Sequence, residues 1–527
     1  MGLSVGSVTR GASGSARLRY VIPGRCTRSG WQLAASMLGA AVLLGSVAAP
    51  TTAATTFPPL PGDPPAPPGA DPRSPRPDIV VLVLDDVPEL DGRLWTRMPN
   101  IRRYLVDEGM EFTDTHGETP TCAPGRAGFL TGLHTHNHGA YATDGSLFQP
   151  GETIATELQS VGYHTVEVGK YLNLFERIYP KWPPGWDEFH GYGGDYYDYT
   201  LWNNGLPRRY GHRPSDYSTD VIADLAVGAL RRAPKDQPLF AWITPYAMHK
   251  PWAVAPRHQQ AKGCSLPRWK PQGYMEKDVR DKPAYVQSRK IKQPGGYELR
   301  RICRGLLSAD QLLGRVVRKL KQLDRLDNTM LIVTSDNGMT YGSQRILHDK
   351  KSPYASQIPF YVRWPRVLGR DPTDVTERIQ NIDLAPTLCD IAGCDLGPYP
   401  TGQSKPDGRS FLKLLTGERD VLERQTVLTS YQDSERRMPS YWSVTTTASS
   451  PLAREGCAQR RSAGCRWMYT EYETGEVELY DISNGPCHAW KRRMKGDPCM
   501  LDNRAGERRY ADVQTSLRRE LTRLRES

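Results

Sequence analysis

Long apolar runs in this chain stop abruptly at polar residues. Continuous aliphatic runs rich in Val and Ile are typical of strands that are buried on both faces of a parallel sheet. The carboxyl ends of parallel strands meet at one sheet edge, where ligands bind. The clearest runs are residues 79–84 and 330–335, and they are followed by Asp85, Asp86, Asp336 and Asn337. We therefore expect three carboxylates and an amide to lie together at one edge.

Two further apolar runs lead to basic side chains in the same way. Residues 164–168 lead into Lys170, and residues 239–243 lead to His249. A lone lysine is usually solvated, and a lone histidine usually packs in the interior. At the same sheet edge as the acidic residues, however, these two side chains predict an anion contact and a proton donor.

The remaining pattern predicts a large α/β domain followed by a smaller one. Residues 310–326 carry apolar side chains at helical spacing, which predicts a helix that packs on the sheet. Beyond about residue 416 the pattern changes to short strands separated by turns, and an amphipathic helix closes the chain. These strands are expected at 441–445, 467–469 and 477–481, and the helix at 512–525.

Length and composition are those of a globular protein with two domains. The chain has 527 residues, of which 38% are hydrophobic and 24% are charged. The formal net charge of +11 is spread along the chain, and it favours anionic ligands. Because the sequence contains none of the familiar nucleic-acid-binding motifs, we expect no nucleic-acid partner.

The N-terminal region predicts export. Residues 31–49 are rich in Leu, Ala and Val and follow Arg25 and Arg28. The apolar stretch is short and interrupted by polar residues, so it predicts a cleaved signal peptide within 1–54 and no membrane span. Residues 55–77 are dense in proline and predict an extended linker. We therefore expect a secreted protein.

The most informative motif places Cys122, Pro124 and Arg126 at alternate positions, where a loop is expected to become a helix. A helix N-terminus stabilises negative charge through its dipole and its unpaired N–H groups. Arg126 adds a planar cation that suits an oxyanion. The simplest alternative is a buried structural cysteine that precedes an ordinary helix.

This segment resembles the Cys-x-Pro-x-Arg signature of type I sulfatases, in which a formylglycine-generating enzyme oxidises the cysteine to formylglycine. Gly125 stands where that family usually has serine. The resemblance covers most of residues 78–415 and implies an alkaline phosphatase-like sandwich, with a large, mostly parallel sheet flanked by helices. It also implies a family helix at 379–389 and a smaller C-terminal domain, 416–527, with an antiparallel sheet and a helix.

The resemblance also implies roles for individual residues. A divalent cation is bound by Asp85, Asp86, Asp336, Asn337 and the modified Cys122. Hard oxygen ligands of this kind favour Ca²⁺, with Mg²⁺ as the alternative. The sulfate group is surrounded by Arg126, Lys170, His249 and Lys350. Lys350 lies four residues before Tyr354, and Ala355 replaces a family glutamate there, so Lys351 stays open as a substitute.

In the mechanism that the resemblance implies, a hydroxyl of hydrated formylglycine attacks sulfur and His249 protonates the leaving alcohol. The residue that deprotonates the second hydroxyl is uncertain, because Leu172 replaces the usual histidine. His138 is one candidate for that base. With His134 and His136 it forms an alternating set, which is expected at the rim of the site in preference to a zinc cluster.

Residues 169–173 resemble the branch of N-acetylglucosamine-6-sulfatases and heparan 6-O-endosulfatases. The basic segment 263–296, with Trp269, Tyr274 and Tyr285, is expected to lie over the active-site edge and to contact sugars and anions. The substrate predicted is a 6-O-sulfated hexosamine of a glycan, or a small sulfate ester. Two alternatives are a phosphonate monoester hydrolase or phosphodiesterase of the same superfamily, and a non-catalytic binder of sulfated glycans.

Cysteine parity agrees with export. If Cys26 leaves with the signal peptide and Cys122 is modified, eight of the 10 cysteines remain, which suits a set of disulfides. Proximity along the sequence suggests the pairs Cys264–Cys303, Cys389–Cys394, Cys457–Cys465 and Cys487–Cys499, although other pairings stay open.

Overall fold

The computed structural model describes most of the chain from residue 76 onward. The described range is 76–527 without 91, 142–144, 146–147, 149–150, 178–181, 419–421, 423, 433–437, 448–449, 455–465, 484–486 and 488–496. The expected signal region, and the expected linker except its last two residues, therefore lie outside the described residues. The described residues form one compact unit, so the expected domain boundary near residue 415 stays a prediction.

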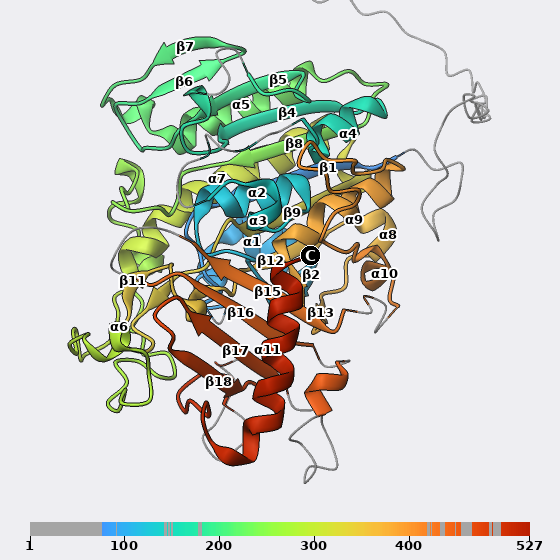
Figure 1. Cartoon of the computed structure of the whole chain (residues 1–527). Coiled ribbons are helices and arrows are strands. Elements are labelled where there is room, and N and C mark those ends of the chain that lie inside the picture. Colours follow the sequence, from blue (N-terminus) through green and yellow to red (C-terminus); the bar gives the residue numbers. More distant parts are fainter. Residues whose placement is uncertain are drawn as a thin grey trace, which may run out of the picture. The chain divides into compact units, whose positions relative to one another are not determined.

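A ten-stranded mixed sheet forms the centre of the fold (Figure 1). Its strand order is β13-β2-β12-β9-β1-β8-β4-β5-β6-β7, and the five strands from β9 to β5 are parallel. The strands are β1 Asp78–Leu84, β2 Met110–Phe112, β4 His164–Lys170, β5 Glu188–Tyr192, β6 Thr200–Asn203, β7 Leu206–Arg209, β8 Leu239–Thr244, β9 Thr329–Ser335, β12 Phe360–Arg363 and β13 Thr373–Val375. The prediction of a large, mostly parallel sheet is confirmed.

The register between β1 and β9 places the polar residues that follow the two strands side by side. β1 and β9 are parallel neighbours in which Leu84 pairs with Ser335, so Asp85 and Asp336 leave the sheet at the same level. All residues of both strands are buried, as their continuous apolar runs predict.

Helices cover both faces of the sheet. Alternate β1 side chains pack into two separate cores, because neighbouring residues of a strand point to opposite faces. One core includes α1 Pro99–Ile101, α5 Ser218–Arg232 and α7 Arg300–Gln322, and the other includes α2 Cys122–Thr131, α4 Ile154–Ser160, α9 Leu384–Ala392 and α10 Leu412–Leu415. Shorter elements complete the domain: α3 Thr135–His138, α6 Ala284–Gln287, α8 Pro365–Leu368, β3 Thr115–His116, β10 Thr340–Tyr341, β11 Leu347–Asp349 and β14 Ile379–Gln380.

Two expected helices differ from the observed ones. The helix expected at 310–326 begins ten residues earlier, because 300–309 continue its buried face with Ile302, Cys303 and Leu306. The helix expected at 379–389 is only partly correct. Ile379–Gln380 pairs with β3 as a short strand, and the α-helix begins at Leu384 after a 3₁₀ turn.

The C-terminal region is a four-stranded antiparallel sheet with one helix, as expected (Figure 1). The strands are β15 Thr426–Tyr431, β16 Tyr441–Thr446, β17 Trp467–Tyr472 and β18 Val477–Asp481, and the helix is α11 Ala511–Arg525. Val513, Leu517 and Leu521 of the helix pack on the sheet. β15 was not predicted, although its six residues are all buried.

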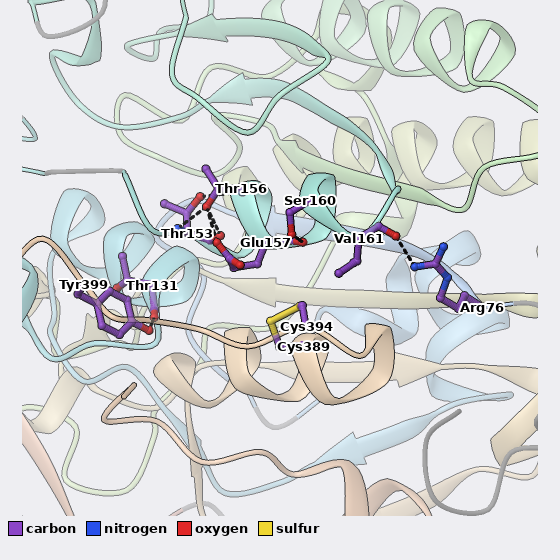
Figure 2. Close-up of a disulfide and its surroundings, with 10 residues drawn as sticks. All are labelled: Arg76, Thr131, Thr153, Thr156, Glu157, Ser160, Val161, Cys389, Cys394 and Tyr399. Carbon is purple, nitrogen blue, oxygen red and sulfur yellow. Dashed lines mark hydrogen bonds between the residues drawn. A yellow bond between two sulfur atoms is a disulfide. The ribbon is translucent and has the colours of Figure 1, made fainter. Parts of the chain in front are cut away.

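Three expected disulfides are present: Cys264–Cys303, Cys389–Cys394 and Cys487–Cys499. The expected pair Cys457–Cys465 lies outside the described residues. Figure 2 shows the Cys389–Cys394 disulfide near α4, whose first turn is capped reciprocally by Thr153 and Thr156. Within the described residues, no helix combines the length and apolarity needed to cross a membrane.

Candidate active site

The polar residues that follow β1 and β9 meet as the sequence predicts. The Asp86 N–H donates to Asp336 Oδ1 at 3.1 Å, and Asn337 Nδ2 donates to Asp86 Oδ1 at 2.9 Å. Asp86 has a φ of 60°, in the left-handed region that non-glycine residues seldom adopt. Such backbone conformations concentrate at functional sites, where the surrounding structure holds them.

Cys122 begins α2, directly beside this acidic group. Its side chain is buried, and it is the free cysteine of the described residues. Gly125, the departure from the usual serine, packs against the main chain of Asp336. A Cβ atom at this position would lie 2.4 Å from the Asp336 carbonyl oxygen. The close approach of α2 to the end of β9 therefore requires glycine.

Lys350 is the basic side chain that contacts Cys122. Its Nζ lies 3.0 Å from Cys122 Sγ, 2.6 Å from Asp86 Oδ1 and 3.5 Å from Asn337 Oδ1. Lys351 Nζ instead lies 5.7 Å from the centre of the Tyr431 ring. Of the two lysines left open by the sequence, Lys350 is therefore the one at the site.

Arg126 and Lys170 enclose the other side of the acidic group. Arg126 Nε donates to Asp336 Oδ2 at 2.9 Å, and its Nη2 lies 3.4 Å from Asp85 Oδ2. Another Arg126 nitrogen donates to the Lys170 carbonyl oxygen, which fixes α2 against the end of β4. Lys170 Nζ contacts Asp85 Oδ2 at 2.7 Å. Both basic side chains are almost fully buried.

His249 approaches from the loop after β8. Its Nε2 lies 3.6 Å from Asp86 Oδ2, and its Nδ1 lies 2.6 Å from the Lys250 carbonyl oxygen. The loop is held to β1, because Met248 N donates to Asp85 O at 2.8 Å. The His249 side chain is 27% exposed, which makes it the most accessible of the predicted site residues that form ion pairs here.

Three carboxylates therefore face three cations in a buried site. Burial raises the pKa of Asp85 and Asp86, but the nearby cations outweigh it and hold both pKa values below the ordinary range. Lys170 is the main opposing cation for Asp85, and Lys350 for Asp86. Burial raises the pKa of the Cys122 thiol despite both lysines. The unmodified side chain is thus a weakly nucleophilic thiol at neutral pH.

The residues suit a divalent cation. Ligand atoms of Asp85, Asp86, Cys122 and His249 all lie within 4.8 Å of one another. Asp85 Oδ1 is buried and has no hydrogen-bond partner among the described residues, so this oxygen is available to bind a cation. The group contains three of the five predicted ligands, Asp85, Asp86 and Cys122, and adds His249. Asp336 lies beside it and accepts from Arg126 Nε and from the Asp86 N–H.

The one candidate base for the second chemical step, His138, faces Glu118. Leu172 is fully buried in the core. His138 Nε2 faces Glu118 Oε1 at 3.9 Å, and His134 Nδ1 faces Glu118 Oε2 at 3.8 Å. Both histidines are buried, so the expectation that they lie at a rim is wrong. Within the described residues, the only close group of metal-ligating acidic, cysteine and histidine side chains is the one that contains Cys122, so these histidines form no such group.

The basic segment 263–296 lies against the loop that carries Lys350. Arg289 Nη2 approaches Asp349 Oδ2 at 3.3 Å, directly before Lys350. Arg345 donates to the carbonyl oxygens of Glu276 and Lys277, at 2.7 and 2.5 Å. The segment thus lies beside the loop that carries Lys350, while its Tyr285 hydroxyl lies 3.3 Å from the Tyr472 hydroxyl of the C-terminal sheet. Contact of this segment with sugars stays a prediction.

Tyr246 is a site residue that the sequence did not single out. Its ring centre lies 5.4 Å from Lys170 Nζ and 4.6 Å from the His249 ring centre. A tyrosine after a buried strand is too common to carry a prediction, and only the loop geometry reveals its place.

Comparison with known proteins agrees with this geometry. The Sulfatase family model matches residues 77–394. Human N-acetylglucosamine-6-sulfatase is 30% identical over 478 residues, which cover 81% of this chain and 82% of that protein. The extracellular sulfatase SULF-1 homolog of Drosophila melanogaster is 31% identical over 363 residues, which cover 65% of this chain and 32% of that protein.

The fold is shared with a solved structure. BT4656, in complex with its substrate D-glucosamine-2-N,6-O-disulfate, aligns with a TM-score of 0.64 and 21% identity, over 86% of this chain and 98% of that chain. The family match covers well over half of the sequence and includes all nine predicted site residues. The chain therefore belongs to the Sulfatase family and is a sulfuric ester hydrolase.

Proposed function

We propose that this enzyme removes a 6-O-sulfate group from a hexosamine of a glycan, after Cys122 has been converted to formylglycine. The observation that carries the proposal is the position of Cys122, 3.0 Å from Lys350 Nζ and within 4.8 Å of Asp85, Asp86 and His249 ligand atoms. A reactive group at residue 122 thus lies beside basic side chains that can bind an anionic substrate. It also lies beside carboxylate oxygens that can bind a metal ion.

The state of Cys122 supports its conversion. The thiol is buried, its pKa is raised, and it is free, whereas six other described cysteines form disulfides. A neutral thiol is a poor nucleophile. Conversion to formylglycine replaces it with an aldehyde, whose hydrate carries two hydroxyl groups on one carbon.

Asp85, Asp86, Asp336 and Asn337 are the residues that we propose to hold the metal together with residue 122. Ca²⁺ suits this oxygen-rich set better than a transition metal, with Mg²⁺ as the alternative. When bound, a divalent cation supplies Lewis acidity toward oxygen atoms at residue 122.

The basic residues of the site bind the sulfate ester, and His249 acts on its leaving group. Arg126, Lys170 and Lys350 converge on the acidic group, and their positive charges stabilise the negative charge of a sulfate ester in the transition state. His249, the more exposed residue, is positioned to protonate the departing alcohol oxygen. The base for release of the enzyme-bound sulfate is not assigned.

The substrate class rests on two further observations. The human relative of 30% identity over most of both chains is an N-acetylglucosamine-6-sulfatase. The segment beside the Lys350 loop carries eight Lys or Arg residues but only three Asp or Glu residues between 263 and 296. Distributed cations of this kind suit a glycan with neighbouring sulfate or carboxylate groups.

A substrate panel tests the proposal. Modified, metal-loaded enzyme is incubated with 6-O-sulfated glucosamine, its 2-O- and 3-O-sulfated isomers, an aryl sulfate and an aryl phosphonate monoester. The expected result is sulfate release from the 6-O ester and the aryl sulfate. Release from the aryl ester alone would contradict the glycan assignment, and faster turnover of the phosphonate would favour the phosphoryl enzyme of the same superfamily.

We also propose that the protein is secreted. The basic start and apolar core of residues 25–49 support this, as does an extracellular relative at 31% identity. Expression of the full chain, followed by N-terminal sequencing of protein from the medium, tests it. The expected N-terminus lies near residue 54, whereas retention of all activity inside the cells would contradict export.

A further inference from the structure

The C-terminal sheet contains a buried carboxylate that is bound by three tyrosines. Glu478 on β18 is fully buried. Tyr472 donates to its Oε2 at 2.6 Å, and Tyr480 donates to its Oε1 at 2.5 Å. Tyr354 also donates to Oε1. Three hydroxyl groups thus bind a carboxylate that, among the described residues, has no cation in hydrogen-bonding contact. Such an arrangement requires closely defined side-chain positions.

One of the three tyrosines does not belong to the C-terminal sheet. Tyr472 lies on β17 and Tyr480 on β18, but Tyr354 lies in the loop after β11, four residues beyond Lys350. The same short loop therefore contacts Cys122 through Lys350 and Glu478 through Tyr354. Ala355, which stands in place of a family glutamate, provides no carboxylate of its own beside Tyr354.

The start of this loop is anchored to the large domain. Thr340 Oγ1 donates to the Asp349 carbonyl oxygen at 2.6 Å, and Lys351 N donates to Asp349 Oδ1 at 3.0 Å. After residue 355, Gly117 N donates to the Ser356 carbonyl oxygen at 2.8 Å. Between these anchors, the Tyr354 hydroxyl ties the loop to the interior of the C-terminal sheet.

We propose that Glu478 is a positioning residue for sulfate ester hydrolysis, which acts through Tyr354 to hold Lys350 against residue 122. Lysine has a long, flexible side chain, so the position of its amine depends on the main chain that carries it. Displacement of a catalytic group by about 1 Å can lower turnover by up to about a hundredfold. This inference rests on the role proposed above for Lys350, and it gives the C-terminal sheet a part in catalysis.

Two matched substitutions test the inference. Tyr354→Phe removes the hydroxyl that links Glu478 to the Lys350 loop. Tyr480→Phe removes a hydroxyl from the same oxygen of Glu478 but leaves that link in place. We expect Tyr354→Phe to lower kcat about tenfold with little change in KM, and Tyr480→Phe to keep kcat within about twofold of wild type. Both should lower the urea midpoint of unfolding by similar amounts.

A second readout does not require activity. Hydrogen exchange of the peptide that spans 350–356 should become faster in Tyr354→Phe and stay unchanged in Tyr480→Phe. Equal kcat losses in the two variants, or unchanged exchange and kcat in Tyr354→Phe, would overturn the inference. If wild type hydrolyses no sulfate ester, the proposed substrate and modification fail, and the exchange comparison still decides whether Tyr354 holds the loop.

Discussion

Two buried clusters that contain carboxylates, one at the active site and one around Glu478, are stabilised in opposite ways. At the active site, Asp85, Asp86 and Asp336 face arginine and lysine side chains at 2.6 to 3.4 Å. In the C-terminal sheet, the hydrogen-bond partners of Glu478 within the described part of the chain are all hydroxyl groups. The cations hold the pKa values of Asp85 and Asp86 below the ordinary range, whereas burial raises the pKa of Glu478.

The difference separates two uses of a buried carboxylate. Cation-paired carboxylates stay ionised, so they can serve a metal and an anionic substrate at neutral pH. A carboxylate that accepts hydrogen bonds from three phenols gains defined geometry from neutral donors. The loop 350–354 joins the two clusters, since Lys350 belongs to the first and Tyr354 to the second.

The largest effect should come from breaking the charged cluster. Asp85→Asn removes a carboxylate that contacts Lys170, Arg126 and the place proposed for the metal. We expect kcat to fall on the order of a thousandfold, with loss of bound calcium measured by elemental analysis. Asp310→Asn is the matched control, because Asp310 is equally buried but binds the start of α1. That variant should lose stability and keep its turnover; wild-type turnover in Asp85→Asn would contradict the assignment.

The two neighbouring lysines allow a sharper test of the same cluster. Lys350→Met should lower kcat about a hundredfold, because Lys350 alone of the pair contacts Cys122 and Asp86. Lys351→Met should stay within about threefold of wild type. Steady-state kinetics on an aryl sulfate measure both. A larger loss in Lys351→Met would show that the roles of the two lysines are exchanged.

Replacement of His249 should have an effect that depends on the leaving group. His249→Gln removes the proton donor, which matters more for a sugar alcohol than for a nitrophenol, because the alcohol departs less readily as an anion. We expect a loss of about a hundredfold on a sugar sulfate and less than about tenfold on nitrophenyl sulfate. Equal losses on the two substrates would instead indicate that His249 binds the metal, in keeping with its place among the four grouped ligands.

The smallest effects should distinguish two buried carboxylates by pH. Glu118 accepts from Thr135 at 2.6 Å, and despite burial His134 and His138 lower its pKa to about 2. Its contribution to stability is therefore present above its ordinary pKa of about 4.5 and is lost as pH falls toward about 2. Glu478 has a raised pKa, so its contribution is largest at low pH and declines as pH rises.

Urea unfolding of Glu118→Gln and Glu478→Gln measures this difference. The destabilisation caused by Glu118→Gln, roughly 2 to 3 kcal/mol at pH 7, should shrink between pH 5 and pH 3. The destabilisation caused by Glu478→Gln should instead grow as pH falls toward the ordinary glutamate pKa of about 4.5. Parallel pH profiles for the two variants would contradict the distinction between a carboxylate paired with basic side chains and one bound by hydroxyl groups.

Much of the charged cluster could be predicted from the sequence, whereas the tyrosine cluster could not. Asp85 and Asp336 follow continuous apolar runs, and parallel pairing brings such strand ends together without further information. Glu478 and Tyr354 are far apart in sequence, and nothing in their local patterns marks them as partners. Their contact depends on how the C-terminal sheet packs on a loop, which is a tertiary feature.

Two predictions that differ from the structure also show the limits of local sequence patterns. The predicted start of α7 is too late, because the arginines within 300–304 obscure the apolar periodicity of its first turns. Proximity of His138 to Cys122 in the sequence suggests His138 as a base. In the structure, however, the His138 Nε2 atom faces Glu118. Local pattern predicts the buried strands β1 and β9 well, but it misplaces the starts of α7 and α9 and misses β15. It predicts contacts only where the sheet itself determines them.

The most direct measurement is the correlation between the chemical state of residue 122 and turnover. Preparations with different degrees of conversion are obtained by coexpression with a formylglycine-generating enzyme at several levels. The aldehyde fraction is measured by mass spectrometry of the peptide that contains Cys122, and sulfate release is measured on the same samples. We predict that activity per molecule rises in proportion to the aldehyde fraction and extrapolates to zero when only the thiol is present. Full activity in protein that retains the thiol would contradict formylglycine catalysis at this site.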